Sequence, residues 1–496
     1  MTQRNRTGAA AGGLAAALTA LALLAGGCTE ATGGVRGTPG SAGLRDPYFP
    51  KLGNGGYDVR HYALTLAYDP RTGRLDGTAE ITARATQDLS AFNLDLSGLT
   101  VDRASVDDAP AAVNRAGNEL TLRPSEEIRE GAAFKATVTY GGVPESITDA
   151  DGSEEGWLRT DDGAVAVGEP AGSMTWFPGN HHPSDKAAYE LTLTVPAGLE
   201  GLSNGVRTAR RTAADGRVTT EWHTTEPMAS YLATVAIGHF VTDETGGKDE
   251  TGRKDETGSA SPPATAKTSR PVPVPVPIPV LTAAEPSVAA ASATLRGEIP
   301  QILDRQAKRF GPYPFSTAGA IVTEDGTLGY ALETQSRPVF PAASFDRTTL
   351  VHELAHQWFG NSVTPASWRD LWLNEGFATY AEWLYTEEYE HVPARTHFER
   401  AFAQDANWAF PPADPPTAEN LFDPPVYQRG AMVLHKLRET VGDRTFDEIL
   451  RGWPAKYRHA NATTADFTAY AESVAGRDLD ALWDVWLFGG EKPDRP

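Results

Sequence analysis

The chain has 496 residues, 40% of them apolar, and it contains 11 tryptophans. This length exceeds that of one ordinary domain, so two or three domains with sizeable hydrophobic cores are expected. The formal net charge of −21 argues against binding to nucleic acid or to anionic lipid by general electrostatic attraction, and no nucleic-acid partner is expected. The single cysteine, Cys28, leaves no intramolecular disulfide possible.

The N-terminus has the pattern of an export signal. Arg4 and Arg6 precede an apolar Ala/Leu run that is too short to span a bilayer comfortably, and small residues follow it up to Cys28. The tetrapeptide LAGG before Cys28 resembles a bacterial lipobox, which implies cleavage of a signal peptide at residues 1–27 and acylation of the Cys28 thiol. The alternative is an ordinary signal peptide with an incidental cysteine. We expect a cell-surface lipoprotein, anchored to the outer face of the membrane through a flexible tether at residues 28–45.

Eight segments after Tyr57 alternate polar and apolar residues and are separated by Gly, Asp and Pro turns, which is the pattern of half-buried strands. In chain order they read HYALTLAYD, GTAEITARAT, AFNLDLSGL, ELTLRP, FKATVTYGG, YELTLTVP, RVTTEWHTT and SYLATVAIGHF. They predict an N-terminal β domain at residues 46–280, built as a sandwich or saddle of antiparallel sheets.

One stretch inside this range differs in composition. Residues 241–270 contain two copies of KDETG and then mainly Pro, Ser, Thr and Ala. The segment has few apolar residues, and their burial would not compensate for the entropy lost on ordering the chain. A disordered low-complexity insertion is therefore expected. The following segment, PVPVPVPIPV, alternates proline with β-branched residues. It predicts an edge strand or a polyproline segment that ends the domain.

Helical patterns dominate residues 281–496, the predicted second domain. SVAAASATLRGEIPQILDRQAKRFG is helical in composition but interrupted by Pro300, and TTLVHELAHQWFGN and WLNEGFATYAEWLYTEEY predict two further helices. AGAIVTEDG predicts a buried strand, and residues 427–488 predict several more helices. The chain is therefore predicted to be a multidomain α+β protein, with a mostly α second domain that contains a small β component.

The second of these helices carries the strongest chemical signal, the motif His-Glu-x-x-His at His352, Glu353 and His356. Residues four apart on a helix differ by only about 40° in direction, so both imidazoles face one point. Glu353 lies about 100° round the helix. Its carboxylate is therefore too far from the two imidazoles to bind the same metal ion with them, but it is close enough to hold a metal-bound water molecule. Two histidines and a third ligand leave one tetrahedral position open, as a hydrolytic zinc site requires.

A third ligand is predicted at Glu375, in the segment WLNEGFATY of the next helix. Packing of that helix on the first would bring the Glu375 carboxylate to the open side of the imidazoles, and His–His–Glu is a catalytic zinc set. Glu382 lies two turns further along the same face and is expected to orient an imidazole by accepting its N–H. The alternative for Glu382 is a surface carboxylate. One Zn²⁺ per chain is the expected cofactor.

The blocks VHELAHQWFGN and LWLNEGFATYAEW look like those of zinc aminopeptidases of the aminopeptidase N type, a gluzincin family that also includes leukotriene A hydrolase. WFPGNHHPSDKAAYELTLTVP, LSNG, RFGPYPF, VYQRGAMVLHKLRETVGDRTF and WDVWL fit the same pattern. The resemblance covers residues 46–490 except the insertion. It implies a thermolysin-like catalytic domain in a short bacterial lipoprotein member of that family.

The resemblance also implies roles for residues around the substrate. Tyr427, in YQRGA, matches the family tyrosine that hydrogen-bonds the oxyanion, where a phenol can stabilise the developing charge. Glu333, in YALET, falls where the family has Gly-x-Met-Glu-Asn, whose glutamate binds the free α-amine of the substrate. Tyr330 and Thr334 replace the Gly and the Asn of that motif. Glu169 occupies the segment that usually supplies a glutamine to the amine site.

Together these parts predict an aminopeptidase that removes N-terminal residues from peptides. Glu353 takes a proton from the attacking water and returns it to the leaving amine, while zinc and Tyr427 stabilise the charge on the carbonyl oxygen. Glu333 and Glu169 hold the substrate N-terminus so that the first peptide bond lies over the metal. Three alternatives stay open: an endopeptidase or broad peptidase on the same zinc site, a lipid-epoxide hydrolase, and a non-catalytic surface binding lipoprotein. A monomer is expected.

Overall fold

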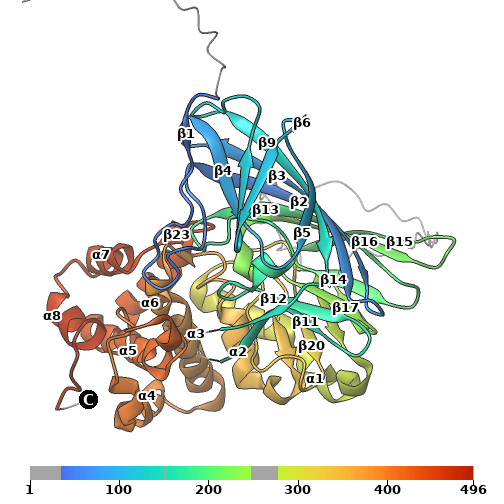
Figure 1. Ribbon diagram of the computed structural model, residues 1–496. Coiled ribbons are helices and arrows are strands. Elements are labelled where there is room, and N and C mark those ends of the chain that lie inside the picture. The colour runs from blue at the N-terminus through green and yellow to red at the C-terminus, as the bar shows by residue number, and fades with distance from the viewer. Residues whose placement is uncertain (1–34, 150–151, 247–277, 495–496) are drawn as a thin grey trace, which may run out of the picture. The chain divides into compact units, whose positions relative to one another are not determined.

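The computed structural model describes residues 35–149, 152–246 and 278–494. The predicted signal peptide, Cys28 and the start of the tether lie outside the described residues. Residues 247–277 are also outside them, and these contain most of the insertion predicted at 241–270 and most of the proline-alternating segment PVPVPVPIPV that follows it. From Val35 onward the described chain belongs to one structural unit, in which strands come first and helices follow (Figure 1).

The N-terminal half of the described chain is a β domain, as predicted. Its strands are β1 Thr38–Pro39, β2 Tyr57–Asp69, β3 Arg74–Ala85, β4 Leu89–Asp95, β5 Thr100–Val106, β6 Ala109–Pro110, β7 Ala112–Ala116, β8 Glu119–Arg123, β9 Ala133–Gly142, β10 Ser146–Thr148, β11 Glu154–Arg159, β12 Ala164–Val167, β13 Lys186–Val195, β14 Glu200–Ser203, β15 Val206–Thr212, β16 Val218–Ala229 and β17 Val235–Gly238. Within the described residues they form three sheets, of order β15-β16-β13-β2-β3-β9-β5-β6, β1-β4-β8-β7 and β10-β11-β12-β17-β14.

Alternation of side chains decides which strands the sequence reveals. In β2, Tyr62, Leu64 and Leu66 are buried, whereas Ala63 and Thr65 between them are more exposed, so this strand was predictable. All four residues of β12 are buried, and such a strand shows no alternation. The prediction of antiparallel sheets is wrong at one central pair, because β13 pairs parallel with β2. Parallel strands need a long crossover connection, which the chain between β2 and β13 provides.

The second domain has its own sheet, of order β18-β19-β20-β21, with β18 Val241–Thr245, β19 Val280–Ala284, β20 Ala318–Thr323 and β21 Val339–Pro341. β20 is the buried strand predicted from AGAIVTEDG. β18 differs from the prediction, because residues 241–245 form an ordered edge strand and not the start of a disordered insertion. Its side chains are all exposed, but backbone pairing with β19 orders it. This sheet therefore starts before the domain boundary predicted near residue 280.

The helices are α1 Pro286–Phe310, α2 Arg347–Ala355, α3 Trp372–Tyr385, α4 Ala394–Ala403, α5 Gly430–Val441, α6 Asp443–Lys456, α7 Thr464–Ala475 and α8 Asp480–Leu482. Two short strands, β22 Thr364–Pro365 and β23 Asn461–Ala462, pair with each other in parallel. The predicted interruption at Pro300 is wrong, because α1 continues through it. Ile299, Ile302 and Leu303 are buried on one face of α1, and their packing outweighs the hydrogen bond that proline cannot donate.

Hydrogen bonds from one half-buried and one buried side chain join the two domains on either side of α2. Lys186 in β13 donates from Nζ to the carbonyl oxygens of Asn361 and Ser362, at 3.0 Å each. Asn204, next to β14, donates from Nδ2 to the carbonyl oxygen of Gln335 at 2.8 Å. Buried polar groups are costly to leave without partners, so these contacts hold the β domain against the segments before and after α2.

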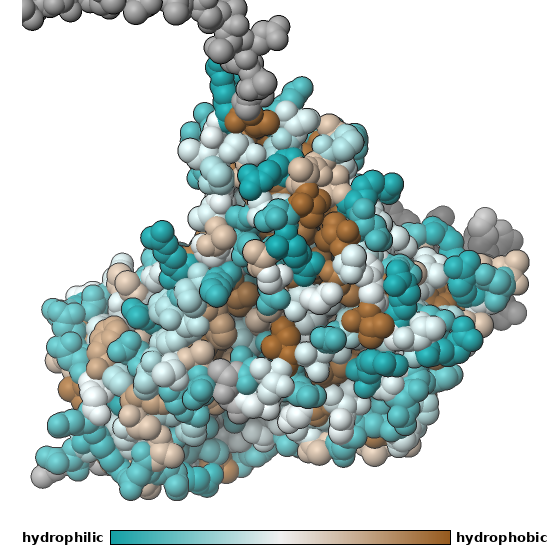
Figure 2. All heavy atoms as spheres, viewed as in Figure 1, coloured by the Kyte–Doolittle hydropathy of each residue, from teal (hydrophilic) through white to brown (hydrophobic). Residues whose placement is uncertain are grey.

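The face of the molecule seen in Figure 2 is mostly hydrophilic, with small apolar areas between polar side chains. In the part of the chain that the structure describes, no helix combines the length and the apolar character needed to cross a bilayer.

Candidate metal centre and active site

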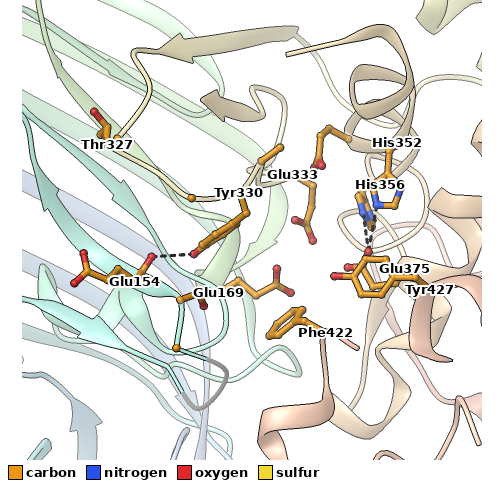
Figure 3. A pocket seen from close by; sticks show the side chains of 16 residues that line it. Glu154, Glu169, Thr327, Tyr330, Glu333, His352, His356, Glu375, Phe422 and Tyr427 are labelled. Carbon is orange, nitrogen blue, oxygen red and sulfur yellow. Dashed lines mark hydrogen bonds and ion pairs between the residues drawn. The ribbon is translucent and has the colours of Figure 1, made fainter. Parts of the chain in front are cut away.

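Three side chains from the α2 and α3 region converge in a cavity of about 730 Å³ (Figure 3). Glu375 Oε2 lies 3.2 Å from His352 Nε2 and 3.4 Å from His356 Nε2. One potential ligand atom from each residue lies within 4.8 Å of the others. The structure therefore brings the predicted set together. Two imidazole nitrogens and one carboxylate oxygen are the donors that a catalytic zinc site uses.

The second nitrogen of each ring has a partner that leaves Nε2 directed at the cavity. His356 Nδ1 lies 3.1 Å from the carbonyl oxygen of Phe359, which can only accept, so Nδ1 carries a proton and Nε2 is the nitrogen that can bind a metal ion. His352 Nδ1 lies 2.6 Å from Glu382 Oε1, where the sequence places an orienting carboxylate. α2 ends at Ala355, earlier than the predicted helix, but His356 keeps a right-handed helical backbone and the two rings stay one turn apart.

The charges around these ligands favour a divalent cation. Burial raises the pKa of Glu375, but the imidazoles of His356 and His352 outweigh it and hold that pKa at about 2. Burial lowers the pKa of His356, but the carboxylates of Glu375 and Glu333 raise it to about 9. Without a metal the imidazole keeps a proton, which a bound cation would displace. The residues therefore fit a zinc ion in both geometry and charge.

Glu353 lines the same cavity and is only 5% exposed. One of its carboxylate oxygens lies within 4.8 Å of a His356 ring nitrogen and of a Glu333 oxygen. Burial raises its pKa to about 8, although the two nearby imidazoles oppose this rise. Glu353 is thus beside the predicted ligands and is available to accept and return a proton.

Tyr427 reaches the cavity from a π-helical turn, Pro425–Arg429, that leads directly into α5. Its ring stacks on the His352 imidazole, with centroids 6.2 Å apart and an interplanar angle of 17°. Burial, and then the negative charge of Glu375, raise the pKa of Tyr427 well above its usual value. The phenol therefore stays protonated at neutral pH and can donate a hydrogen bond beside the metal ligands.

Glu333 and Glu169 enter the cavity from different domains and both point into it (Figure 3). They are 3% and 7% exposed, and among the described residues neither Glu333 Oε1 nor Glu169 Oε1 has a hydrogen-bond partner. Burial raises the pKa of both carboxyl groups, and the charge of Glu333 adds to the effect on Glu169. Buried carboxylate oxygens without partners call for a cationic or hydrogen-bond-donating ligand.

Two polar residues just after the His-Glu-x-x-His motif have a structural role that no sequence motif indicates. Gln357 Nε2 and Asn361 Nδ2 both donate to the carbonyl oxygen of Glu333, at 3.2 and 2.6 Å. Gln357 Oε1 also accepts from the backbone N–H of Ser336 at 2.8 Å. These bonds hold the Glu333 segment against the residues that directly follow α2. Their only sequence signal is that both residues lie in QWFGN, directly after His356.

Residues of both domains form the outer wall of the cavity. Tyr330, one of the two departures from the family motif, donates from its hydroxyl to the carbonyl oxygen of Glu154 in β11 at 3.3 Å (Figure 3). Phe422 lines the opposite part of the cavity, near Tyr427. The side chain at position 330 therefore links the segment that carries Glu333 to the β domain, which a glycine would not do.

Replacing Glu382 tests its contact with His352. We expect Glu382→Ala to weaken zinc affinity by about 10- to 100-fold, because the imidazole loses the acceptor that orients its ring. Competition with a chromophoric chelator measures this affinity. Glu388→Ala is the matched control, since Glu388 pairs with Arg309 on the surface and should leave zinc affinity unchanged. Equal zinc affinity in Glu382→Ala and the unmodified protein would contradict the role of Glu382.

Two family models match the chain. Residues 59–232 match the peptidase M1 N-terminal domain, and residues 342–486 match the peptidase family M1 domain. The first range lies in the β domain. The second contains α2, α3 and α5 and with them the convergent histidines, Glu375 and Tyr427.

Curated relatives extend the similarity across most of the chain. Aminopeptidase M1-D of Oryza sativa subsp. japonica is 27% identical over 465 residues, which cover 86% of this chain and 49% of the relative. Aminopeptidase M1 of Arabidopsis thaliana is 24% identical over 470 residues, which cover 86% of this chain and 50% of the relative. The chain thus spans about half the length of the curated relatives it matches.

Solved structures match the whole arrangement of the two domains. An M1 zinc metallopeptidase from Deinococcus radiodurans has a TM-score of 0.80 at 28% identity, covering 92% of this chain and 98% of that one. A mutant M1 zinc metallopeptidase from the same organism, bound to a Tyr-Ser-Ala substrate, has the same TM-score and identity and is covered to 99%. From the two matching domain models and this shared fold, the chain belongs to the peptidase M1 family.

Proposed function

We propose that this protein is a zinc-dependent aminopeptidase that hydrolyses the first peptide bond of peptides with a free N-terminus. The observation that carries the proposal is the pair of buried carboxylates, Glu333 and Glu169, whose unpaired oxygens share one cavity with the three potential metal ligands. A substrate ammonium satisfies both carboxylates, whereas an acylated N-terminus leaves them unpaired. The names of the relatives, and the tripeptide substrate of the structural neighbour, support a peptide as substrate.

The reaction needs a base and an acid at the scissile bond, and one residue serves as both. Zinc held by His352, His356 and Glu375 would polarise a carbonyl oxygen and lower the pKa of a water molecule. Glu353 accepts the proton of the attacking water at its carboxylate, because it lies beside the ring nitrogen of His356. The same carboxyl group then gives this proton to the leaving amine.

Other residues of the cavity stabilise charge and position the substrate. The Tyr427 hydroxyl donates a hydrogen bond to the carbonyl oxygen as negative charge develops on it. Glu333 and Glu169 bind the substrate ammonium, so the first peptide bond comes to lie at Glu353. The hydrogen bond from Gln357 to the Glu333 backbone sets the distance between the carboxylates that bind the ammonium and the metal ligand His356.

Comparison of free and N-acetylated peptides of one sequence tests the exopeptidase activity. We expect kcat/KM to be lower for the acetylated peptide by on the order of 10⁴-fold, because it leaves buried carboxylates without a partner. Glu333→Gln should lower kcat/KM for the free peptide by about 10²-fold, since one charge partner of the ammonium is lost. Equal cleavage of the free and acetylated peptides would favour the alternative, an endopeptidase on the same metal site.

The proposal extends to the location of the protein. Residues 1–28 support export and a lipid anchor on Cys28, which holds a monomeric enzyme at the outer face of the cell membrane. We expect Cys28→Ala to move the protein from the membrane fraction to the soluble fraction, measured by immunoblotting after ultracentrifugation. Unchanged membrane association of the variant would rule out the lipid anchor.

A further inference from the structure

The buried guanidinium of Arg429 is a feature that the catalytic steps leave unexplained. Arg429 is 0% exposed and lies two residues after Tyr427. Its Nε donates to the carbonyl oxygen of Trp486 at 3.0 Å, and its Nη1 donates to that of Phe410 at 3.2 Å. The groups that accept from it are backbone carbonyl oxygens. Burial of a cation is expensive unless its donors are satisfied, so this arrangement indicates a specific structural task.

The remaining contacts of Arg429 define what it connects. Its Nη2 donates to the carbonyl oxygens of Val485 and Gly489, and its guanidinium lies over the Trp408 ring, 4.7 Å from the centroid. Three of the four carbonyl acceptors, at residues 485, 486 and 489, lie in or just after the π-helical turn Trp483–Leu487, which we call the C-terminal turn. Arg429 thus ties the turn that carries Tyr427 to the C-terminal turn.

The residue that follows Arg429 packs against α3, the helix that carries Glu375. Gly430, the first residue of α5, packs against Gly376 of α3, and a Cβ on either glycine would lie 2.9 Å from backbone atoms of the other. Gly376 directly follows the metal ligand Glu375. Such a close approach of two helix backbones is possible only without side chains. The contact sets the distance between α5 and Glu375.

The position of the Tyr427 hydroxyl depends on these two anchors. Among the described residues no hydrogen bond holds the hydroxyl itself, and its ring is placed by the backbone turn and by stacking on His352. A catalytic group must be held within a fraction of an ångström of its productive geometry. The glycine contact and Arg429 both act at the C-terminal end of the turn: Gly430 sets its distance from α3, and Arg429 ties it to the C-terminal turn.

We propose that Arg429 is a positioning residue, which holds the Tyr427 hydroxyl at the reacting carbonyl by tying its turn to the C-terminal turn. The inference rests on the proposed function, because it gives Arg429 a role in the reaction only through Tyr427. The C-terminal turn, whose residues line no part of the cavity, then contributes to the rate through Arg429.

A double-mutant cycle of Arg429→Lys and Tyr427→Phe tests this coupling. Lysine keeps the positive charge, but its single ammonium group cannot donate to several carbonyl oxygens in the fixed directions of a planar guanidinium. We expect Arg429→Lys to lower kcat by about 10- to 100-fold with KM changed less than about threefold, because a displaced catalytic group affects the transition state most. In the Tyr427→Phe protein the same substitution should change kcat by less than about twofold.

Controls separate this role from general destabilisation. Arg296→Lys is matched, because Arg296 is also buried and donates to Thr282 Oγ1 and the Ala289 carbonyl oxygen, but lies on α1 outside the cavity. It should lower the melting temperature and leave kcat unchanged. Zinc content is measured in every variant. If Arg429→Lys does not fold, Trp408→Phe, which removes part of the ring under the guanidinium, replaces it in the cycle with a smaller expected loss of kcat.

Each outcome of the cycle decides a different claim. An equal loss of kcat from Arg429→Lys with and without the Tyr427 hydroxyl, or no loss at all, overturns the positioning role and leaves the proposed aminopeptidase intact. An unchanged kcat in Tyr427→Phe alone refutes the catalytic role of Tyr427 and the positioning role with it.

Discussion

Glu353→Gln is expected to lower kcat by about 10³-fold or more while the protein keeps one zinc ion per chain. Glutamine has nearly the same shape as glutamate, but its amide neither accepts a proton from water nor gives one to the leaving amine. Glu353 is not one of the three converging metal ligands, so the metal should stay bound. Steady-state kinetics on an aminoacyl fluorogenic substrate and metal analysis by mass spectrometry measure the two effects.

A matched substitution controls for the loss of a carboxylate elsewhere. Glu298 on α1 pairs with Arg347 at the surface, so Glu298→Gln should retain full activity and full zinc content. Two results would contradict the role of Glu353 as proton acceptor. One is retained activity in Glu353→Gln, and the other is loss of zinc together with the activity, which would make the residue a ligand.

Removal of the metal should abolish peptide hydrolysis and lower the melting temperature together. The convergent ligands His352, His356 and Glu375 are assembled only in the folded chain, so a bound cation stabilises the folded state and its removal lowers the free energy of unfolding. Zinc at 100 times its dissociation constant would stabilise the folded state by about 2.7 kcal/mol. Activity and melting temperature are measured after dialysis against a chelator, and again after zinc is added back.

His356→Ala distinguishes a metal effect from an effect of the chelator itself. The variant lacks one ligand, so it should be inactive, contain no zinc and melt at a temperature that neither chelator nor added zinc changes. Full activity of the unmodified protein after verified removal of metal would overturn the metallopeptidase proposal. A melting temperature that falls equally in the His356→Ala variant would show that the chelator acts elsewhere.

The sequence by itself determined the local parts of this protein. The spacing of His352 and His356 on one helix places both imidazoles on one side, because helix geometry depends only on neighbouring residues. Alternation in segments such as β2 revealed most long strands for the same reason. Local pattern failed where tertiary contacts overrule it. Packing carries α1 through Pro300, and backbone pairing orders β18 although none of its side chains is buried.

Only the tertiary structure decided how distant residues meet in the site. Glu169, Glu333 and Glu375 come from a loop of the β domain, the segment before β21 and α3, yet one oxygen from each lies within 4.8 Å of the others. No local pattern encodes such a meeting, because it depends on how hydrogen bonds between the two domains, such as that from Lys186 to Asn361, hold the domains together. The anchoring of Tyr427 through Arg429 was equally hidden, since its acceptors are backbone carbonyl oxygens, which every residue carries.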